Sequence, residues 1–183
     1  MVKVMVSAGH SNTDPGAVCH GVREADIACD LRNYTAFYLR QADVRGLEVV
    51  TDGEGNINLP LVNAASLARS CDYAVEFHMN AAKDQQVYGV ECLSQPKDKK
   101  LAQAIAREIT KVTKTNIRGV MGWKPENSGQ HTRLAFVRAG GIIIEVDFIT
   151  NALMCETVVY KRWLVAKAVA TAILDYLKSE VKL

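Results

Sequence analysis

The chain has 183 residues, 49% of them hydrophobic, which is enough for one globular domain around a single core. Its 22 basic and 20 acidic residues give a formal net charge of +2, so it lacks the strong positive charge typical of nucleic-acid-binding domains. The most apolar late segment, residues 163–177, is interrupted by Lys167 and Asp175 and falls short of the about 20 apolar residues of a membrane span. We therefore expect a single domain over residues 1–183, monomeric, with no nucleic-acid partner and no stable membrane insertion.

The cysteines and the amino terminus indicate the cellular compartment in which the protein is made. Five cysteines are an odd number, and they include no C-x-x-C pair, which favours free thiols in a reducing compartment. The opening residues, MVKVMVSAGH, hold only a brief apolar run and no cleavage region, so they do not resemble a secretory signal peptide. We expect no signal peptide and synthesis in a cytoplasm.

Apolar periodicity predicts strands that alternate with helices. In chain order, the patterns predict a strand at 2–6, a helix at 23–41, a strand at 47–50, a helix at 59–71, strands at 73–80 and 87–93, a helix at 97–114, strands at 133–138 and 140–148, and a helix at 157–177 with Trp163 on its inner face. Residues 115–133 contain three glycines and a proline and predict a long loop, which at that length is usually functional or disordered. The alternation predicts an α/β fold, with a mixed, mostly parallel sheet of about six strands and helices on both faces.

The segment YAVEFHMN, residues 73–80, places a histidine near the end of a strand. Two-residue alternation puts Glu76, His78 and Asn80 on one face. Open α/β sheets bind ligands at the carboxyl ends of their strands, so His78 and Asn80 are candidates for a site. A single strand histidine is more often a structural residue with satisfied hydrogen bonds, and Asn80 is also typical of a strand-ending turn.

The segment GGIIIEVDFITN, residues 140–151, contains a carboxylate inside an otherwise apolar strand. An unpaired buried carboxylate costs several kcal/mol unless a cation or hydrogen bonds compensate for its lost hydration. Glu145 is therefore either a catalytic or metal-binding group, or one partner of a buried salt bridge with an arginine such as Arg138.

One histidine and one glutamate near the amino terminus are further candidates for a functional site. His10 lies in the glycine-containing loop SAGHSNTDPGA, residues 7–17, directly after the first predicted strand. Glu24 begins the first predicted helix, where a carboxylate is favoured by the helix dipole without any further role. Neither residue alone indicates a function.

Four segments in chain order together carry a family resemblance. They are GHSNTDPGA at 9–17, the Arg-Glu pair at 23–24, FHMN at 77–80 and IIEVDFITN at 143–151, with LVNAA at 61–65 and RGV at 118–120 in addition. The chain resembles the zinc-dependent N-acetylmuramoyl-L-alanine amidases of the amidase type 3 class, which are peptidoglycan hydrolases. The resemblance runs from residue 2 to about 177, essentially the whole chain.

The resemblance implies one Zn²⁺ per chain and a role for each matching residue. His10, Glu24 and His78 correspond to the zinc ligands of the family, and Glu145 corresponds to its catalytic glutamate. Two histidines and one carboxylate with an open fourth position suit a hydrolytic zinc. The implied reaction is cleavage of the amide between N-acetylmuramic acid and L-alanine of the stem peptide, with Glu145 as general base and then general acid.

Two carboxylates depart from the family pattern. The family generally has a small or hydroxyl residue at the position of Glu76 and a glycine at that of Asp147. Glu76 shares a strand face with His78, and Asp147 shares one with Glu145, so both carboxylates can lie near the metal. Three roles stay open for each: raising the pKa of Glu145, hydrogen bonding to a histidine ligand, or pairing with a basic residue elsewhere. Asn80 is a further candidate to orient a ligand or contact substrate.

The long loop supplies the remaining candidates. His131 and Arg133, with Trp123 and Lys124, are expected to line the substrate groove and bind sugar faces or stem-peptide carboxylates. His20 is expected to be a solvated loop residue.

Other functions also fit parts of this pattern. One alternative is an inactive peptidoglycan-binding module, although all four matching residues are present. Another is a zinc peptidase or deacylase acting on a different amide, although the 14-residue spacing from His10 to Glu24 is unlike H-E-x-x-H. Without a separate wall-binding domain or a signal peptide, the chain is expected to be a phage-endolysin-like enzyme, made in a host cytoplasm and acting on the wall after release. A bacterial enzyme released by lysis of the mother cell would have the same features.

Overall fold

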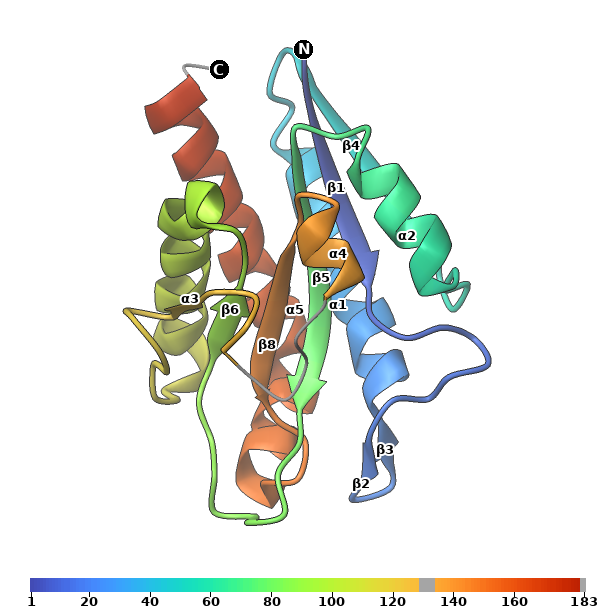
Figure 1. The fold of residues 1–183 in the computed structure, drawn as a ribbon, viewed down its shortest axis with the longest axis vertical. Coiled ribbons are helices and arrows are strands. Elements are labelled where there is room, and N and C mark those ends of the chain that lie inside the picture. The colour runs from blue at the N-terminus through green and yellow to red at the C-terminus, as the bar shows by residue number, and fades with distance from the viewer. Residues whose placement is uncertain (129–133, 182–183) are drawn as a thin grey trace.

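The computed structural model describes residues 1–128 and 134–181, which form a sheet covered by helices on both faces (Figure 1). The main sheet contains β1 (Val2–Ala8), β4 (Leu47–Thr51), β5 (Tyr73–Asn80), β6 (Glu91–Leu93), β7 (Trp123–Lys124) and β8 (Ile142–Phe148), and a separate hairpin contains β2 (Val18–Cys19) and β3 (Val22–Arg23). The helices are α1 (Glu24–Gln41), α2 (Leu61–Ala68), α3 (Lys99–Thr113), α4 (Ala135–Arg138) and α5 (Ala152–Tyr176), with a 3-10 turn η1 (Pro96–Asp98) and a π-helical turn η2 (Leu177–Val181).

The sheet has the order β4-β1-β5-β8-β6-β7. The strands β4, β1, β5 and β8 are parallel to one another, β6 is antiparallel to β8, and β7 is parallel to β6. The prediction of a mixed, mostly parallel six-stranded sheet is confirmed. No helix in the two described ranges is long and apolar enough to cross a membrane.

The two faces of the sheet carry two apolar clusters. The larger cluster joins alternate strand residues such as Val75, Phe77 and Ile144 to the inner faces of α1, α3 and α5. The smaller cluster joins Ala74 and Ile143, from the opposite face, to α2 and α4. Because α2 and α4 are short, they cover only the part of this second face that lies near the amino ends of β5 and β8.

The uncovered part of the second face positions the site. By alternation from Ala74 and Ile143, it carries His78 of β5 and Glu145 of β8, whose Cα atoms are register partners. The strand β1 ends at Ala8 on the other side of β5, so the loop that contains His10 begins at the same edge of the sheet. This edge is formed by the carboxyl ends of parallel strands, where α/β folds bind ligands.

The strand expected at 133–138 is wrong, because residues 135–138 form the short helix α4. Its apolar run is too short for periodicity to separate a helix from a strand. Phe136 is fully buried in the smaller cluster, and its ring occupies the space where a side chain at Gly141 would lie. Gly140, with φ of 96°, then turns the chain into β8.

Other boundaries also differ from the expected ones. The strand expected at 87–93 is shortened to 91–93, since Gly89 has φ of 131° and leaves the extended conformation. The last helix begins at Ala152, because the side chain of Asn151 accepts a hydrogen bond from the Met154 amide and caps it. Trp163 is 47% exposed on this helix, so its expected inward position is wrong.

Candidate metal centre and active site

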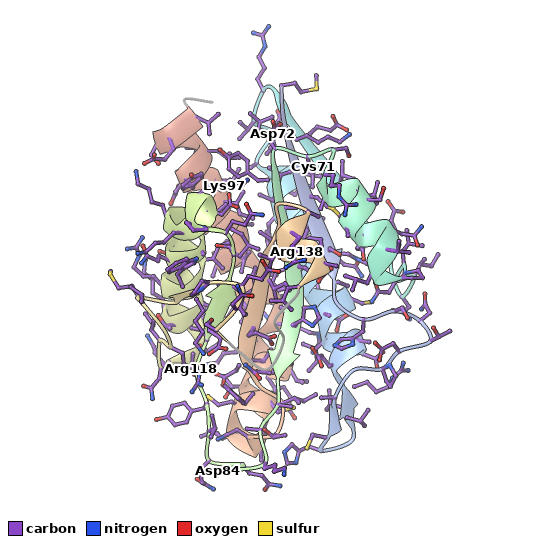
Figure 2. All side chains as sticks on the ribbon, in the orientation of Figure 1. Cys71, Asp72, Asp84, Lys97, Arg118 and Arg138 are labelled. Carbon is purple, nitrogen blue, oxygen red and sulfur yellow. The ribbon has the colours of Figure 1, made fainter. Side chains whose placement is uncertain are left out.

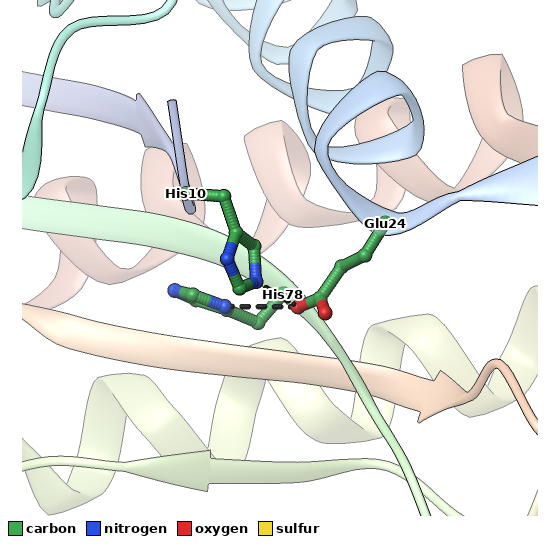
Figure 3. A group of neighbouring side chains, drawn as sticks. All are labelled: His10, Glu24 and His78. Carbon is green, nitrogen blue, oxygen red and sulfur yellow. Dashed lines mark hydrogen bonds and ion pairs between the residues drawn. The ribbon is translucent and has the colours of Figure 1, made fainter. Parts of the chain in front are cut away.

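Three side chains from different elements converge at the carboxyl edge of the sheet (Figure 3). Nε2 of His10 and Nδ1 of His78 lie 2.8 and 3.0 Å from the same oxygen, Oε1 of Glu24. One ligand atom from each residue lies within 4.8 Å of the other two. The structure therefore assembles the three residues that the sequence predicts as metal ligands.

The local structure explains how each ligand reaches this point. His10 follows β1 in a left-handed conformation, with φ of 68°, which turns the chain over the edge of the sheet. Glu24 is the first residue of α1, and its carboxylate accepts hydrogen bonds from the amides of Met79 and Ala17. The bond from Met79 attaches the start of α1 to the end of β5, which carries His78, and the bond from Ala17 attaches it to the preceding loop.

Two glycines leave the room that the ligands need. A Cβ at Gly9 would lie 2.3 Å from Cε1 of His78, and a Cβ at Gly16 would lie 2.5 Å from Nε2 of His10. Gly16 also has φ of 65°, which side-chain-bearing residues rarely adopt. The glycines of the opening loop are therefore part of the site because they let its ligands approach one another.

The far nitrogen of each histidine is held by a second carboxylate. Nδ1 of His10 lies 3.1 Å from Oδ2 of Asp14, and Nε2 of His78 lies 3.1 Å from Oε1 of Glu76. Such carboxylate partners fix the tautomer and the orientation of metal-binding imidazoles. Of the three roles open for Glu76, the structure places it in hydrogen bonding to a histidine, and Ser7 holds its other oxygen through a 3.2 Å bond.

The charges of the three ligands stabilise one another. Burial raises the pKa of Glu24, but the close imidazoles of His10 and His78 outweigh it and hold that pKa well below its usual range. Burial lowers the pKa of both histidines, but the carboxylate of Glu24, 2.8 Å away, raises that of His10, and the hydrogen bonds to Glu24 and Glu76 raise that of His78 well above its ordinary value. Without a metal, the site therefore favours protonated histidines against an ionised Glu24.

The donor set fits a divalent metal ion. Nε2 of His10 is buried and, despite its closeness to Glu24, has no hydrogen bond of acceptable geometry within the described residues. A buried ring nitrogen without a hydrogen bond is costly unless it has another use, and a metal ion supplies one. Two imidazole nitrogens and a carboxylate oxygen are ligands that zinc accepts in hydrolytic sites.

Glu145 lies beside this cluster on the same face of the sheet. Its Oε2 atom is buried and has no hydrogen-bond partner among the described residues. Burial, with the nearby charges of Glu24 and Glu91, raises the pKa of Glu145 to about 7 against the opposing charge of His78. The alternative of a salt bridge with Arg138 is wrong, because Nε of Arg138 lies 2.6 Å from Glu126. A carboxyl group with a pKa near neutrality can both accept and release a proton.

The hydrogen bonds of Asp147 are to the protein backbone. It is fully buried, and its Oδ1 atom accepts hydrogen bonds from the amides of Gly89 and Phe148. These contacts tie the segment before β6 to β8. None of them is to a metal ligand or to a basic side chain.

Asn80 belongs to a charged cluster that the sequence did not reveal as a unit. Its Nδ2 atom donates to Glu91, which also forms ion pairs with Arg118 and Lys124. Glu91 is the register partner of Glu145 across β6 and β8. The acidic residue inside the apolar pattern VYGVECL was the one available signal, comparable to that of Glu145 in its own strand.

The remaining loop candidates have different outcomes. His131 and Arg133 lie outside the described residues. Trp123 lies in β7, where its indole nitrogen donates to Ser94 and Lys99 lies over its ring, so it packs near α3. His20 is exposed, and its Nε2 atom lies 3.2 Å from the carbonyl oxygen of Thr150.

Comparison with known proteins agrees with this site. A family model described as N-acetylmuramoyl-L-alanine amidase, amidase type 3, matches residues 4–175. The chain belongs to this amidase family. As a member it is a peptidoglycan hydrolase, and its cluster of His10, Glu24 and His78 is consistent with the metal site typical of amidase type 3 enzymes.

Solved and curated relatives of this amidase cover nearly all of the chain. A crystal structure from Neisseria meningitidis, of a protein for which the same amidase activity has been proposed, is 45% identical, with 96% of each chain covered and a TM-score of 0.88. The N-acetylmuramoyl-L-alanine amidase of Clostridium difficile 630 shares the fold at 22% identity, with 98% of each chain covered and a TM-score of 0.82. The Staphylococcus aureus protein named Probable autolysin PH is 28% identical over 93% of this chain, which spans 38% of that relative's length.

Proposed function

We propose that this amidase is a zinc enzyme that cleaves the bond between N-acetylmuramic acid and L-alanine of the stem peptide, with Glu145 as its general base and acid. The observation that carries the proposal is the register of His78 with Glu145. It sets a carboxyl group of near-neutral pKa beside a cluster of three metal-binding side chains.

His10, Glu24 and His78 would hold the ion, His10 through Nε2 and His78 through Nδ1, while Asp14 and Glu76 keep the two rings in place. When bound at such a site, zinc lowers the pKa of a coordinated water to about 7 and polarises a carbonyl group. With only three protein ligands, a zinc ion held here would have room for the reactants, as hydrolytic zinc sites require.

Glu145 supplies the proton transfers. In its ionised form the carboxylate accepts a proton from the attacking water, and the protonated form then donates it to the nitrogen of the departing L-alanine. A pKa near the working pH makes both directions of transfer accessible. The buried Oε2 atom, which has no partner in the described residues, is available for this exchange.

Two alternative functions can be distinguished from the amidase activity by experiment. A peptidoglycan-binding module without activity would retain the fold, and a zinc peptidase would use the same metal cluster on another amide. The assembled ligands, their carboxylate partners and Glu145 count against the inactive module, and the match to the amidase family over residues 4–175 favours the amidase over a peptidase. Synthesis in a cytoplasm with release to the wall stays a prediction from the sequence.

The test is digestion of purified muropeptides by the zinc-loaded protein, with the fragments identified by mass spectrometry. The proposal expects intact stem peptides that begin with a free L-alanine amine. A cut within the peptide would contradict the proposed bond, and retained wall binding without any cut would favour the binding module.

Replacing Glu145 tests the assigned role. Glu145→Gln is expected to keep zinc and to lose about 10²- to 10⁴-fold in kcat, the usual contribution of general acid and base catalysis. Glu156→Gln, at an exposed position of α5, is the matched control and should retain full activity. Loss of zinc by Glu145→Gln would instead make Glu145 a ligand.

A further inference from the structure

A second charged cluster lies beside the proposed catalytic centre. Glu91 is 5% exposed, and its Oε2 atom lies 2.6 Å from Nε of Arg118 and 2.7 Å from Nζ of Lys124. Its other oxygen accepts a 3.3 Å hydrogen bond from Asn80. Two cations share one carboxylate, so the cluster carries one net positive charge.

The register of the strands fixes where this charge lies. Glu145 pairs with His78 on one side and with Glu91 on the other, so the three side chains form one row on the same face. With neighbouring strands about 4.8 Å apart, Glu91 is about 5 Å from Glu145 and about 10 Å from His78 along the row. The positive cluster therefore lies on the side of Glu145 that faces away from the metal-binding residues, and Figure 2 shows Arg118 beside the amino end of β6.

Arg118 is held in one orientation. Its guanidinium lies over the ring of Phe148, with 4.9 Å between the guanidinium carbon and the ring centroid. A Cβ at Gly89 would lie 2.7 Å from Cγ of Arg118, so the glycine makes room for the arginine stem. Arg118 donates to Glu91 through Nε alone. Its two Nη atoms form no hydrogen bond in the described part of the chain, so they remain available as donors.

The accessible part of the cluster suits a planar anion. The side chain of Arg118 is 34% exposed and that of Lys124 is 22% exposed, whereas the carboxylate that anchors them is buried. An oriented guanidinium donates to both oxygens of a carboxylate, and the neighbouring ammonium adds a further donor. The cluster thus presents positive charge and hydrogen-bond donors to the solvent, while Glu91 is buried beneath them.

We propose that Arg118 and Lys124 form a subsite for a carboxylate of the stem peptide, beyond the L-alanine that is released. This inference rests on the proposed function. Since Glu145 donates its proton to the departing amine, the peptide leaves on the Glu145 side of the metal centre, which is the side of the cluster. An extended peptide advances about 3.3 to 3.6 Å per residue, so the residue after L-alanine can extend past Glu145 toward the neighbouring strand β6, where Glu91 holds Arg118.

A pair of substrates isolates this contact. Stem peptides whose second residue is D-glutamate carry a free α-carboxylate there, whereas those with D-isoglutamine carry a neutral amide of nearly the same shape. The subsite predicts that kcat/KM is about tenfold or more higher for the muramoyl tripeptide with the carboxylate, since hydrogen bonds to charged groups are stronger than neutral ones.

Variants assign the preference to its residues. Arg118→Gln and Lys124→Gln should each lower the ratio of kcat/KM between the two substrates toward one, and Arg118→Lys should retain only part of it because the planar fork is lost. Arg162→Gln is the matched control: Nε of Arg162 also pairs with a carboxylate, Asp30, and its side chain is 37% exposed, but it lies on α5. It should keep the full ratio.

The outcomes separate the two proposals. If the protein releases stem peptides but treats both substrates alike, or if Arg118→Gln slows both equally, the subsite is wrong and the amidase assignment stands. If neither substrate loses its stem peptide, the proposed function itself fails. Zinc affinity and circular dichroism of each variant, expected to match the parent protein, exclude misfolding as the cause of a lost preference.

Discussion

His78 is held by a carboxylate on each ring nitrogen: Nδ1 lies 3.0 Å from Glu24, and Nε2 lies 3.1 Å from Glu76. Glu76 is in turn held by the hydroxyl of Ser7 on the neighbouring strand β1. The imidazole therefore cannot turn without breaking a hydrogen bond. Glu24 faces the metal-binding position, so Glu76 acts from behind as a positioning residue.

This relationship predicts the effect of removing Glu76. Glu76→Ala should weaken zinc affinity about 10- to 100-fold, the usual cost of losing the partner of a metal-binding histidine. Glu76→Gln, which keeps an acceptor oxygen, should lose less. Competition with a chromogenic chelator measures both affinities. An unchanged affinity in Glu76→Ala would show that Glu24 alone orients His78.

A second prediction concerns Gly16. In Gly16→Ala the new methyl group would lie 2.5 Å from Nε2 of His10 and 2.7 Å from Oε2 of Glu24, so two ligands must move and metal binding should be lost. Gly21→Ala is the control, because Gly21 has a similar φ of 74° but no atom within 4 Å of the added carbon. Both variants share the backbone strain, and only Gly16→Ala should fail to take up zinc in equilibrium dialysis. Equal zinc uptake by the two would contradict the close packing at Gly16.

The raised pKa of Glu145 predicts a pH dependence of stability. The folded-state pKa of about 7 exceeds the ordinary 4.5, so folding favours the protonated form and its stabilising effect is present below pH 4.5. That effect is lost as the pH rises toward 7. Relative to Glu145→Gln, the free energy of unfolding of the metal-free protein should fall by up to about 3 kcal/mol between pH 4.5 and 7, at 1.36 kcal/mol per pKa unit. Urea titrations of both proteins across this range measure the difference, and parallel pH profiles would contradict the prediction.

Metal binding should compete with protons. Without metal, the pKa of His10 and that of His78 are raised, whereas binding requires both rings to have a lone pair at the ligating nitrogen. Zinc uptake should therefore release protons, and zinc affinity should fall as the pH is lowered through the raised pKa values. Calorimetry in buffers of different ionisation enthalpy counts the released protons, and a heat that does not depend on the buffer would contradict the predicted proton release.

Zinc binding should also stabilise the folded state. At a free zinc concentration of about 100 times Kd, the free energy of unfolding should rise by about 2.7 kcal/mol, and a chelator should reverse this gain.

A buried ion pair outside the metal centre should contribute strongly to the stability of the protein. Arg32 and Asp52 are both almost fully buried, 3.2 Å apart, and Arg32 also donates to the carbonyls of Gly55 and Ile57. Arg32→Met leaves the charge of Asp52 unpaired and should cost about 3 to 5 kcal/mol in chemical denaturation.

The controls for this pair are on the same helix and in the pair itself. Arg40→Met removes an exposed arginine of α1 and should change stability by no more than about 0.5 kcal/mol. Arg32→Met combined with Asp52→Asn removes the unpaired charge and should recover part of the loss. If the double variant is no more stable than Arg32→Met, the carbonyl contacts of Arg32 and not its ion pair carry the effect.

The sequence alone was sufficient for the architecture because long apolar patterns are local. The helix at 24–41 and the strands at 73–80 and 142–148 follow from side chains that repeat at helical or alternating spacing. The short run at 135–138 was misassigned, since four residues fit either period and the burial of Phe136 against Gly141 decides for a helix. Helix ends such as Ala152 depended on a single cap by Asn151.

For the site, the sequence determined which residues are present and, through the family motifs, that His10, Glu24, His78 and Glu145 belong together. Only the tertiary structure decided what the added carboxylates do: Glu76 holds His78, whereas Asp147 accepts backbone amides. It alone brought Arg118 and Lys124 to Glu91, opposite Glu145. The physical reason is that hydrogen bonds and ion pairs act over a few ångströms, and residues as far apart in the chain as Gly89 and Asp147, 58 positions, reach that distance only through the register of the sheet.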